Sequence, residues 1–210
     1  MKNNKKTYKK HKFFRVFAII MICILSLILL CNVACFVKAE TNYKHNLLAW
    51  NEYADEGIID EQHKYENLRF GFGTVAKNGC GAMAVYNILF LEGKNPNFVE
   101  VIKRFDSFGE NFFGLGGSKP AMVIKTLKKA GLKVNYSLNK SKFKDIAESS
   151  KYSIFLYVGI ENWVPFGHYQ LMLNFDGEKY ETININGHYT LEEITNIDNT
   201  FLTMMIAVNV

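Results

Sequence analysis

An uncharged run of 22 residues, at positions 16–37, determines which part of this chain can form a folded domain. A basic stretch, an apolar run and then small residues are typical of a secretory signal sequence. Val37-Lys38-Ala39 has apolar and small residues at the positions that signal peptidase recognises, so cleavage is expected after Ala39. The basic residues before the run are Lys2, Lys5, Lys6, Lys9, Lys10, Lys12 and Arg15.

An uncleaved anchor is the alternative to cleavage, because a run of about 20 apolar residues can span a bilayer. A lipid anchor on Cys35 is a third option, but Asn32 stands where a lipobox has leucine. We therefore expect residues 1–39 to be a signal peptide or membrane anchor, with contact to the membrane only through residues 16–37 if they stay uncleaved. The folded part is expected to be secreted, or held on the extracellular side of the cell membrane.

Removing this segment changes both the charge and the cysteine content of the protein. Subtracting the eight basic residues before Glu40 from the chain's 25 leaves 17 against 20 acidic residues, a net charge of −3. No basic surface for nucleic acid follows from such a balance. Cys23, Cys31 and Cys35 belong to the removed segment, so Cys80 is the one cysteine left and an intrachain disulfide is excluded.

The remaining sequence divides into a polar and aromatic lead-in at 40–68 and a domain at 69–210. Apolar periodicity predicts helices first and strands afterwards, with a hairpin turning at Asp176-Gly177. This order predicts an α+β fold, with N-terminal helices packed on a mostly antiparallel sheet. The expected helices cover 80–91, 96–105, 118–130, 142–149 and 191–197, and the expected strands cover 133–138, 152–160, 168–175, 179–186 and 201–208.

Cys80 stands at the start of the helix expected at 80–91, in Asn78-Gly79-Cys80-Gly81. Unpaired backbone N–H groups and the positive end of the helix dipole favour a thiolate there, and the thiolate is the nucleophilic form. A lone cysteine at such a position is also a common small core residue. Cys80 is therefore a candidate nucleophile.

A nucleophilic thiol needs a base and a group that orients the base. His168 is expected to open a strand after the loop 161–167, where its ring can reach a cleft. The second strand of the hairpin returns beside it, which brings Asn184 or Asn186 near the ring. Asn186, closest to the expected strand end, is preferred. His188 is an alternative base, because Gly187-His188-Tyr189 repeats Gly167-His168-Tyr169.

A metal site built on Cys80, His168 and His188 lacks paired-ligand spacing, so neither a metal nor another cofactor is expected.

Three short motifs resemble the papain-like cysteine peptidases, and most closely the compact bacterial group that includes peptidases cleaving double-glycine leader peptides from bacteriocins. They are Gly79-Cys80-Gly81-Ala82-Met83-Ala84, Ser118-Lys119-Pro120 and Gly167-His168-Tyr169. The resemblance implies attack of Cys80 on a peptide carbonyl, His168 as base and later acid, and Asn186 as the orienting residue. The expected partner is then a peptide or protein substrate.

The chain departs from that family at one position. Such enzymes usually place a glutamine about six residues before the cysteine to stabilise the oxyanion, and here that residue is Thr74. Thr74 or Asn78 is the expected substitute, with the Cys80 backbone N–H as the second donor.

Three hypotheses follow from the sequence. The first is a secreted or surface-held cysteine peptidase, or a related hydrolase or acyl transferase. The second, motivated by the missing glutamine, is a non-catalytic papain-like module that binds a peptide or partner protein. The third is an anchored protein whose thiol pairs with another chain. Aromatic residues expected to line a binding groove are Phe108, Phe112, Phe113, Trp163 and Phe166.

Overall fold

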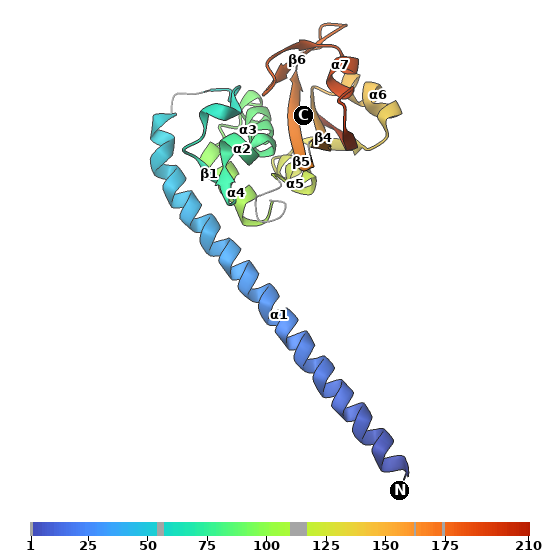
Figure 1. Cartoon of the computed structure of the whole chain (residues 1–210). Helices are drawn as coiled ribbons and strands as arrows, with labels where there is room; N and C mark the ends of the chain where they lie inside the picture. The colour runs from blue at the N-terminus through green and yellow to red at the C-terminus, as the bar shows by residue number, and fades with distance from the viewer. Residues whose placement is uncertain (1, 54–56, 110–116, 162, 174) are drawn as a thin grey trace. The chain divides into compact units, whose positions relative to one another are not determined.

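The computed structural model describes residues 2–53, 57–109, 117–161, 163–173 and 175–210. Two compact units are present, Met1–Lys38 and Ala39–Val210, and each is described by itself. Helix α1 (Lys2–Ala49) supplies the first unit and the opening turns of the second (Figure 1). The sequence predicts the end of the first segment at residue 39, one residue later than the structure. It also predicts a second boundary between residues 68 and 69, whereas in the structure residues 40–68 belong to the second compact unit.

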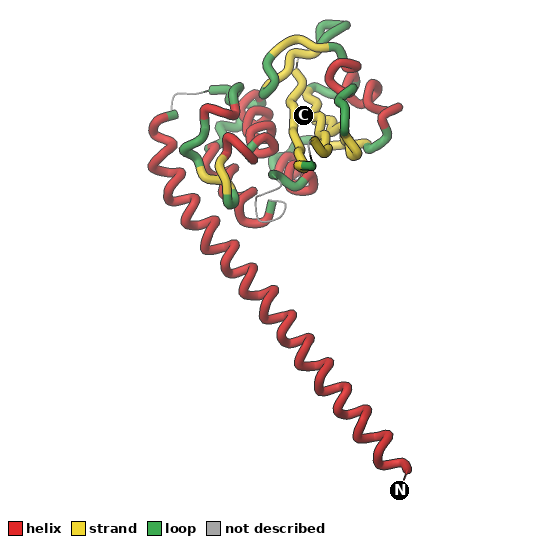
Figure 2. The backbone as a smooth tube through the Cα atoms, viewed as in Figure 1, coloured by secondary structure: helices red, strands yellow, loops and turns green. Residues whose placement is uncertain are grey.

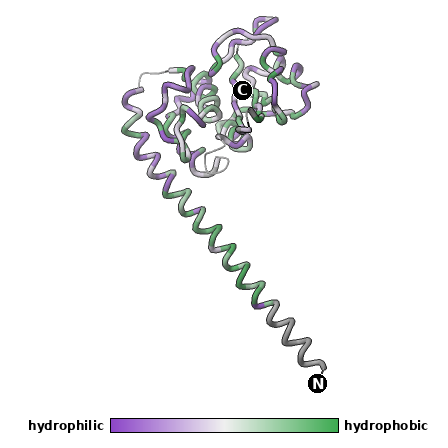
Figure 3. Tube along the Cα trace, viewed as in Figure 1, coloured by the Kyte–Doolittle hydropathy of each residue, from purple (hydrophilic) through white to green (hydrophobic). Residues whose placement is uncertain are grey.

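The first unit is an apolar helix. Within the described residues, one helix is long and apolar enough to cross a membrane, with a mean hydropathy of 3.0 in its best window. Figure 3 shows this stretch as the green middle of α1. A signal sequence near an N-terminus has the same properties, so cleavage and anchoring both stay predictions.

The second unit begins with two asparagines of α1 that are built into the domain. Asn42 Nδ2 donates to Gly71 O at 3.0 Å and to Asp106 Oδ2 at 2.8 Å. Asn46 and Arg69 exchange two hydrogen bonds, of 2.8 and 2.7 Å. Both asparagine side chains are buried, and satisfied buried amides fix the position of a segment. Residues 40–49 therefore stay attached to the domain whether or not the chain is cleaved after Ala39.

Four α-helices follow before the main sheet. A short helix precedes the cysteine, and α3 begins at Cys80 as the sequence predicts. Two further short α-helices lie between strands, and the last of them starts with a capping box of Thr190 and Glu193. The α-helices are α2 (Val75–Asn78), α3 (Cys80–Leu91), α4 (Phe98–Phe108), α5 (Pro120–Lys129), α6 (Phe143–Glu148) and α7 (Leu191–Thr195), and the 3-10 turns are η1 (Trp50–Glu52), η2 (Gln62–Lys64) and η4 (Lys140–Lys142).

The strands form a small hairpin, β1 (Arg69–Phe70) with β2 (Gly73–Thr74), and a six-stranded sheet of order β3-β8-β4-β5-β6-β7. Every neighbouring pair in the sheet is antiparallel. The predicted α+β class with a mostly antiparallel sheet is therefore confirmed. The strands of the sheet are β3 (Lys133–Ser137), β4 (Tyr152–Glu161), β5 (Val164–Leu173), β6 (Tyr180–Ile183), β7 (Gly187–Tyr189) and β8 (Thr200–Asn209).

Side-chain alternation along the strands gives the sheet two apolar faces. On β4, Ile154 and Leu156 pack with α3, α4 and α5, while Phe155 and Tyr157 pack with α6 and α7. Helices consequently lie on both sides of the strands, as Figure 2 shows. The larger core lies on the α3 side and contains Cys80.

Two strand ends differ from the prediction. β5 begins at Val164, so His168 is its fifth residue, and the expected loop at 161–167 is largely the paired end of a β4–β5 hairpin. Pro165 and Gly167 favour a loop by composition, but proline is tolerated here because no described strand pairs with this part of β5 on its other side. β6 ends at Ile183, where Asn184 takes a positive φ of 77°.

Candidate active site

Cys80 lies at the start of α3 and is only 5% exposed. Burial raises the pKa of the Cys80 thiol above its usual value and is the largest effect on it. The backbone N–H groups of Tyr169, Gly81 and Cys80 itself act in the opposite direction and lower the pKa by less. The expectation of a thiolate at this helix start is therefore wrong for this structure, because the sequence argument omitted desolvation.

Gly81 is required by how closely the site is packed. A Cβ added at this position would lie 2.6 Å from Ser118 Cβ and 3.2 Å from Tyr169 Cδ2. Tyr169 also donates its hydroxyl to the carbonyl oxygen of Ser118 at 2.8 Å. The start of α3, Ser118 (two residues before α5) and β5 are therefore closely packed next to Cys80.

His168 occupies a stretch of β5 with an open edge. β5 pairs with β4 from Val164 to Met172, but with β6 only from Leu171 to Leu173. The backbone beside His168 thus has no described strand on its second side, and the N–H of the next residue, Tyr169, is directed at the Cys80 sulfur. The strand that carries His168 therefore reaches Cys80 through the backbone of the next residue, Tyr169.

The imidazole of His168 is partly buried and uncharged. Desolvation lowers its pKa from 6.5 to about 4. Its ring centroid lies 5.7 Å from that of Tyr157, which is its direct partner in the β4–β5 register. Within the described residues, the structure records no hydrogen bond between the Cys80 sulfur and this ring. The raised pKa of Cys80 and the lowered pKa of His168 both favour the neutral forms, a thiol and an uncharged imidazole, at neutral pH.

The residue that contacts the imidazole is Asn184. Its Nδ2 atom lies 3.3 Å from His168 Nε2. Asn186, which the sequence placed first, is exposed, and its Oδ1 accepts a hydrogen bond from the Asn184 backbone at 3.2 Å. Asn186 thus holds the turn that carries Asn184, and Asn184 is the better candidate for orienting the ring.

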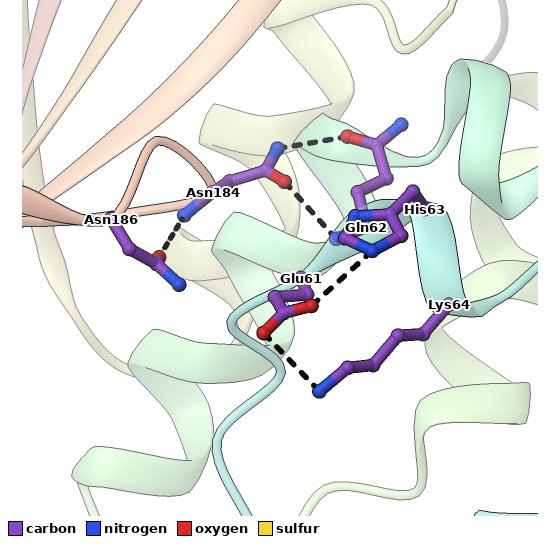
Figure 4. A network of polar contacts seen from close by, with 6 residues as sticks. All are labelled: Glu61, Gln62, His63, Lys64, Asn184 and Asn186. Carbon is purple, nitrogen blue, oxygen red and sulfur yellow. Dashed lines mark hydrogen bonds and ion pairs between the residues drawn. The ribbon is translucent and has the colours of Figure 1, made fainter.

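Gln62 is a site residue that the sequence interpretation missed. It lies in η2, within the segment treated as a lead-in, and is only 9% exposed. Its Oε1 atom accepts a hydrogen bond from Asn184 Nδ2 at 2.8 Å, as Figure 4 shows. Gln62 and Asn184 are 122 residues apart in the chain, so no local pattern could have paired them.

The other predicted site residues lie elsewhere. His188 is exposed in β7, opposite Glu181, and contributes electrostatically at Asp176. No group of three His, Cys, Asp or Glu side chains among the described residues could hold a metal ion.

Thr74 is the residue before α2, and Asn78 is the last residue of that helix, two positions before Cys80. Thr74 Oγ1 is buried without a hydrogen-bond partner among the described atoms. The Asn78 amide packs against Gly73, where an added Cβ would lie 2.7 Å from Nδ2. Thr74 is therefore the better candidate for a donor that a bound substrate could use.

A cavity of about 620 Å³ opens beside His168. Trp163, at the β4–β5 turn, is 97% exposed, and Phe166 lies on the cavity wall. Phe112 and Phe113 lie outside the described residues. The cavity is lined by Tyr157, Phe166, Gly167, His168, Ile197, Asp198 and Asn199.

Comparison with known proteins yields structural neighbours only. No protein-family model matches the sequence, and no curated protein matches it. The crystal structure of the peptidase domain of Streptococcus ComA, a bifunctional ABC transporter involved in quorum sensing, is similar with 11% identity and a TM-score of 0.44. The match covers 61% of this chain and 90% of that chain.

A second similar structure is a double-glycine-motif protease from an AMS/PCAT transporter, in complex with a leader peptide. Its identity is 16% and its TM-score 0.43, and the match covers 61% of this chain and 82% of that chain. Both neighbours are peptidase domains of the group that the sequence motifs resemble. TM-scores below 0.5 do not assign an activity to this chain.

Proposed function

We propose that this protein is a cysteine-dependent hydrolase that cleaves a peptide or amide bond on the outer side of the cell membrane. Cys80 is the nucleophile, His168 transfers the proton, and Asn184 orients His168. The observation that carries the proposal is a pair of contacts made by two consecutive residues, His168 and Tyr169, where β5 has an open edge. There the Tyr169 N–H binds the sulfur, and Asn184 contacts the neighbouring imidazole.

The neutral state of both groups indicates how the reaction would begin. A thiol with a raised pKa has to lose its proton as it attacks, so His168 acts as a general base and not as a preformed imidazolium. The sulfur bonds to the carbonyl carbon, and the proton passes through His168 to the leaving amine. Water then hydrolyses the thioester and regenerates the thiol.

The direct test is to trap the acyl-enzyme. The full chain, in detergent, is mixed with a pool of short peptides or with p-nitrophenyl acetate, quenched in acid and analysed by mass spectrometry. We expect an acyl adduct on Cys80 that disappears with time. Absence of any adduct on Cys80 with all of these probes contradicts the proposed chemistry.

Thr74 is proposed to supply an oxyanion donor in place of the missing glutamine. A Thr74→Val variant keeps the shape of the side chain and removes the hydroxyl. Loss of one oxyanion donor costs on the order of a hundredfold in rate, so kcat for p-nitrophenyl acetate should fall by about tenfold or more. An Asn78→Ala variant measures the competing candidate, and an unchanged kcat in Thr74→Val excludes the role of Thr74.

A non-catalytic peptide-binding module is the second candidate function. The raised pKa of Cys80 favours it, because an inert buried thiol needs no catalytic explanation. The cavity beside His168 would then hold a peptide without cleaving it. Peptide binding that persists without turnover in both the wild type and Cys80→Ala would support this alternative.

A further inference from the structure

The Gln62 side chain is held in one orientation by the start of α2. Its Nε2 atom donates to Val75 O at 2.9 Å and to Ala76 O at 3.0 Å. An amide nitrogen has two hydrogens, and both are used in these bonds. The Oε1 atom is therefore the end of the Gln62 amide that faces Asn184.

This orientation fixes the Asn184 amide in turn. Asn184 Nδ2 donates to Gln62 Oε1 at 2.8 Å, and Asn184 Oδ1 accepts from the Gln62 backbone N–H at 3.3 Å (Figure 4). If the Asn184 amide were rotated by half a turn, its Oδ1 atom would face Gln62 Oε1, and its Nδ2 hydrogens would face the Gln62 backbone N–H. The second hydrogen of Asn184 Nδ2 is left to face His168 Nε2, 3.3 Å away.

An amide N–H that faces an imidazole nitrogen needs a lone pair on that nitrogen. His168 Nε2 is therefore unprotonated, and the proton of the neutral ring is on Nδ1. We propose that Gln62 is a positioning residue which, acting through Asn184, holds His168 in the neutral Nδ1–H tautomer. The tautomer follows from the hydrogen bonds alone, whereas its catalytic consequence rests on the proposed function.

The catalytic consequence is that His168, in this tautomer, cannot yet act as the base for Cys80. Asn184 covers Nε2, so Nδ1 is the ring nitrogen left to serve the proposed nucleophile Cys80. A protonated Nδ1 cannot accept the thiol proton. To become a base, His168 has to move its proton to Nε2, where an oxygen of Asn184 could accept it. Asn184 then has to turn and give up both of its hydrogen bonds with Gln62.

Other titratable groups lie near the hydrogen bonds between Gln62, Asn184 and His168. Tyr157 packs against the imidazole, and Asp198 lines the same cavity. Beside Gln62, Glu61 pairs with His63 at 3.3 Å and with Lys64 at 3.4 Å. Among the described residues, Asn184 is the recorded hydrogen-bonding partner of the His168 ring. The tautomer is therefore assigned through Asn184.

Nuclear magnetic resonance of the side-chain nitrogens reads the tautomer directly. The full chain is labelled with ¹⁵N-histidine in detergent, and a His168→Gln sample assigns the His168 resonances among the five histidines. In the wild type we expect a protonated Nδ1 and an unprotonated Nε2 at neutral pH. A protonated Nε2 in the wild type overturns the proposal.

Gln62→Met tests the role of the Gln62 side chain, because methionine has a similar shape and removes the Oε1 acceptor of Asn184 Nδ2, while the backbone N–H at position 62 remains. We expect the ring to shift towards the Nε2–H tautomer and its pKa to rise by about one unit, a tenfold change in proton affinity. Asn184→Leu removes the amide contact altogether and is the matched control for its effect on the ring. A ring that keeps the wild-type tautomer and pKa in both folded variants contradicts the proposal.

Asn184→Asp gives a decisive result even if Gln62→Met does not fold, since it leaves the Gln62 side chain bonded to α2. A carboxylate only accepts, so it should place the proton on Nε2 and raise the pKa of His168. An unchanged tautomer in this variant counts against control through position 184. All these spectra are recorded without substrate, so failure of the wild type to hydrolyse any probe bears on the proposed function alone.

Discussion

A Cys80→Ala variant is expected to lose hydrolysis of p-nitrophenyl acetate and of any peptide that the wild type cleaves. Removing the nucleophile of a hydrolase leaves only binding and oxyanion stabilisation, so the loss should be at least about a thousandfold in kcat. Cys80 is nearly buried, and alanine is smaller, so the substitution leaves a small void and no clash. The release of p-nitrophenol by the full chain measures the effect, and circular dichroism verifies the fold.

The chain provides a matched control for this variant. Cys23, Cys31 and Cys35 lie outside the compact unit Ala39–Val210, and their triple alanine variant should hydrolyse the ester at the wild-type rate. Loss of turnover in the triple variant, or full turnover in Cys80→Ala, would contradict the role of Cys80. Nonreducing electrophoresis of the same samples tests the third sequence hypothesis, in which a thiol pairs with another chain.

The order of elements was predictable because it depends on local patterns. Helix α3 begins at Cys80 and ends at Leu91, as its continuous apolar sequence indicates, and the hairpin turn at Asp176 is stabilised by hydrogen bonds from Glu178 and Lys179. Both are short-range features that act within a few residues. The start of β5 was not predictable, because Pro165 and Gly167 indicate a loop while pairing with β4 makes them part of a strand.

The site was predictable only in part, for the same reason. Geometry of a hairpin placed both Asn184 and Asn186 near His168, but the early end of β6 and the positive φ of Asn184 decide which one makes contact. Asparagine tolerates that backbone region better than most residues. Gln62 could not be found from the sequence, since its partner lies 122 residues further along the chain.

The protonation states of Cys80 and His168 could not be predicted from the sequence, because they depend on burial. A helix start and its backbone N–H groups can be read from the position of Cys80, and they favour a thiolate. Burial depends on how α3, α5 and β5 pack together, and it is the larger effect on this thiol. Burial in the tertiary structure likewise lowers the pKa of His168. The resting state is therefore a property of the tertiary structure.

A lowered histidine pKa predicts that the domain loses stability in acid. Between pH 6.5 and about 4 the unfolded chain binds a proton at His168 and the folded chain does not. The free energy of unfolding should therefore fall as the pH falls through this window, by at most about 3 kcal/mol from this group. Urea unfolding of the full chain, followed by the fluorescence of Trp50, measures the fall between pH 7 and pH 4.

His168→Gln removes the titration and should flatten this part of the pH dependence. Carboxylates also titrate near pH 4, so the informative quantity is the difference between wild type and variant. His188→Gln, at an exposed position, is the matched control and should behave as the wild type does. Equal pH dependence in wild type and His168→Gln would mean that His168 takes up its proton in the folded state near its usual pKa. Burial of the ring would then not disfavour its charged form, and the neutral state assigned to His168 below pH 6.5 would be wrong.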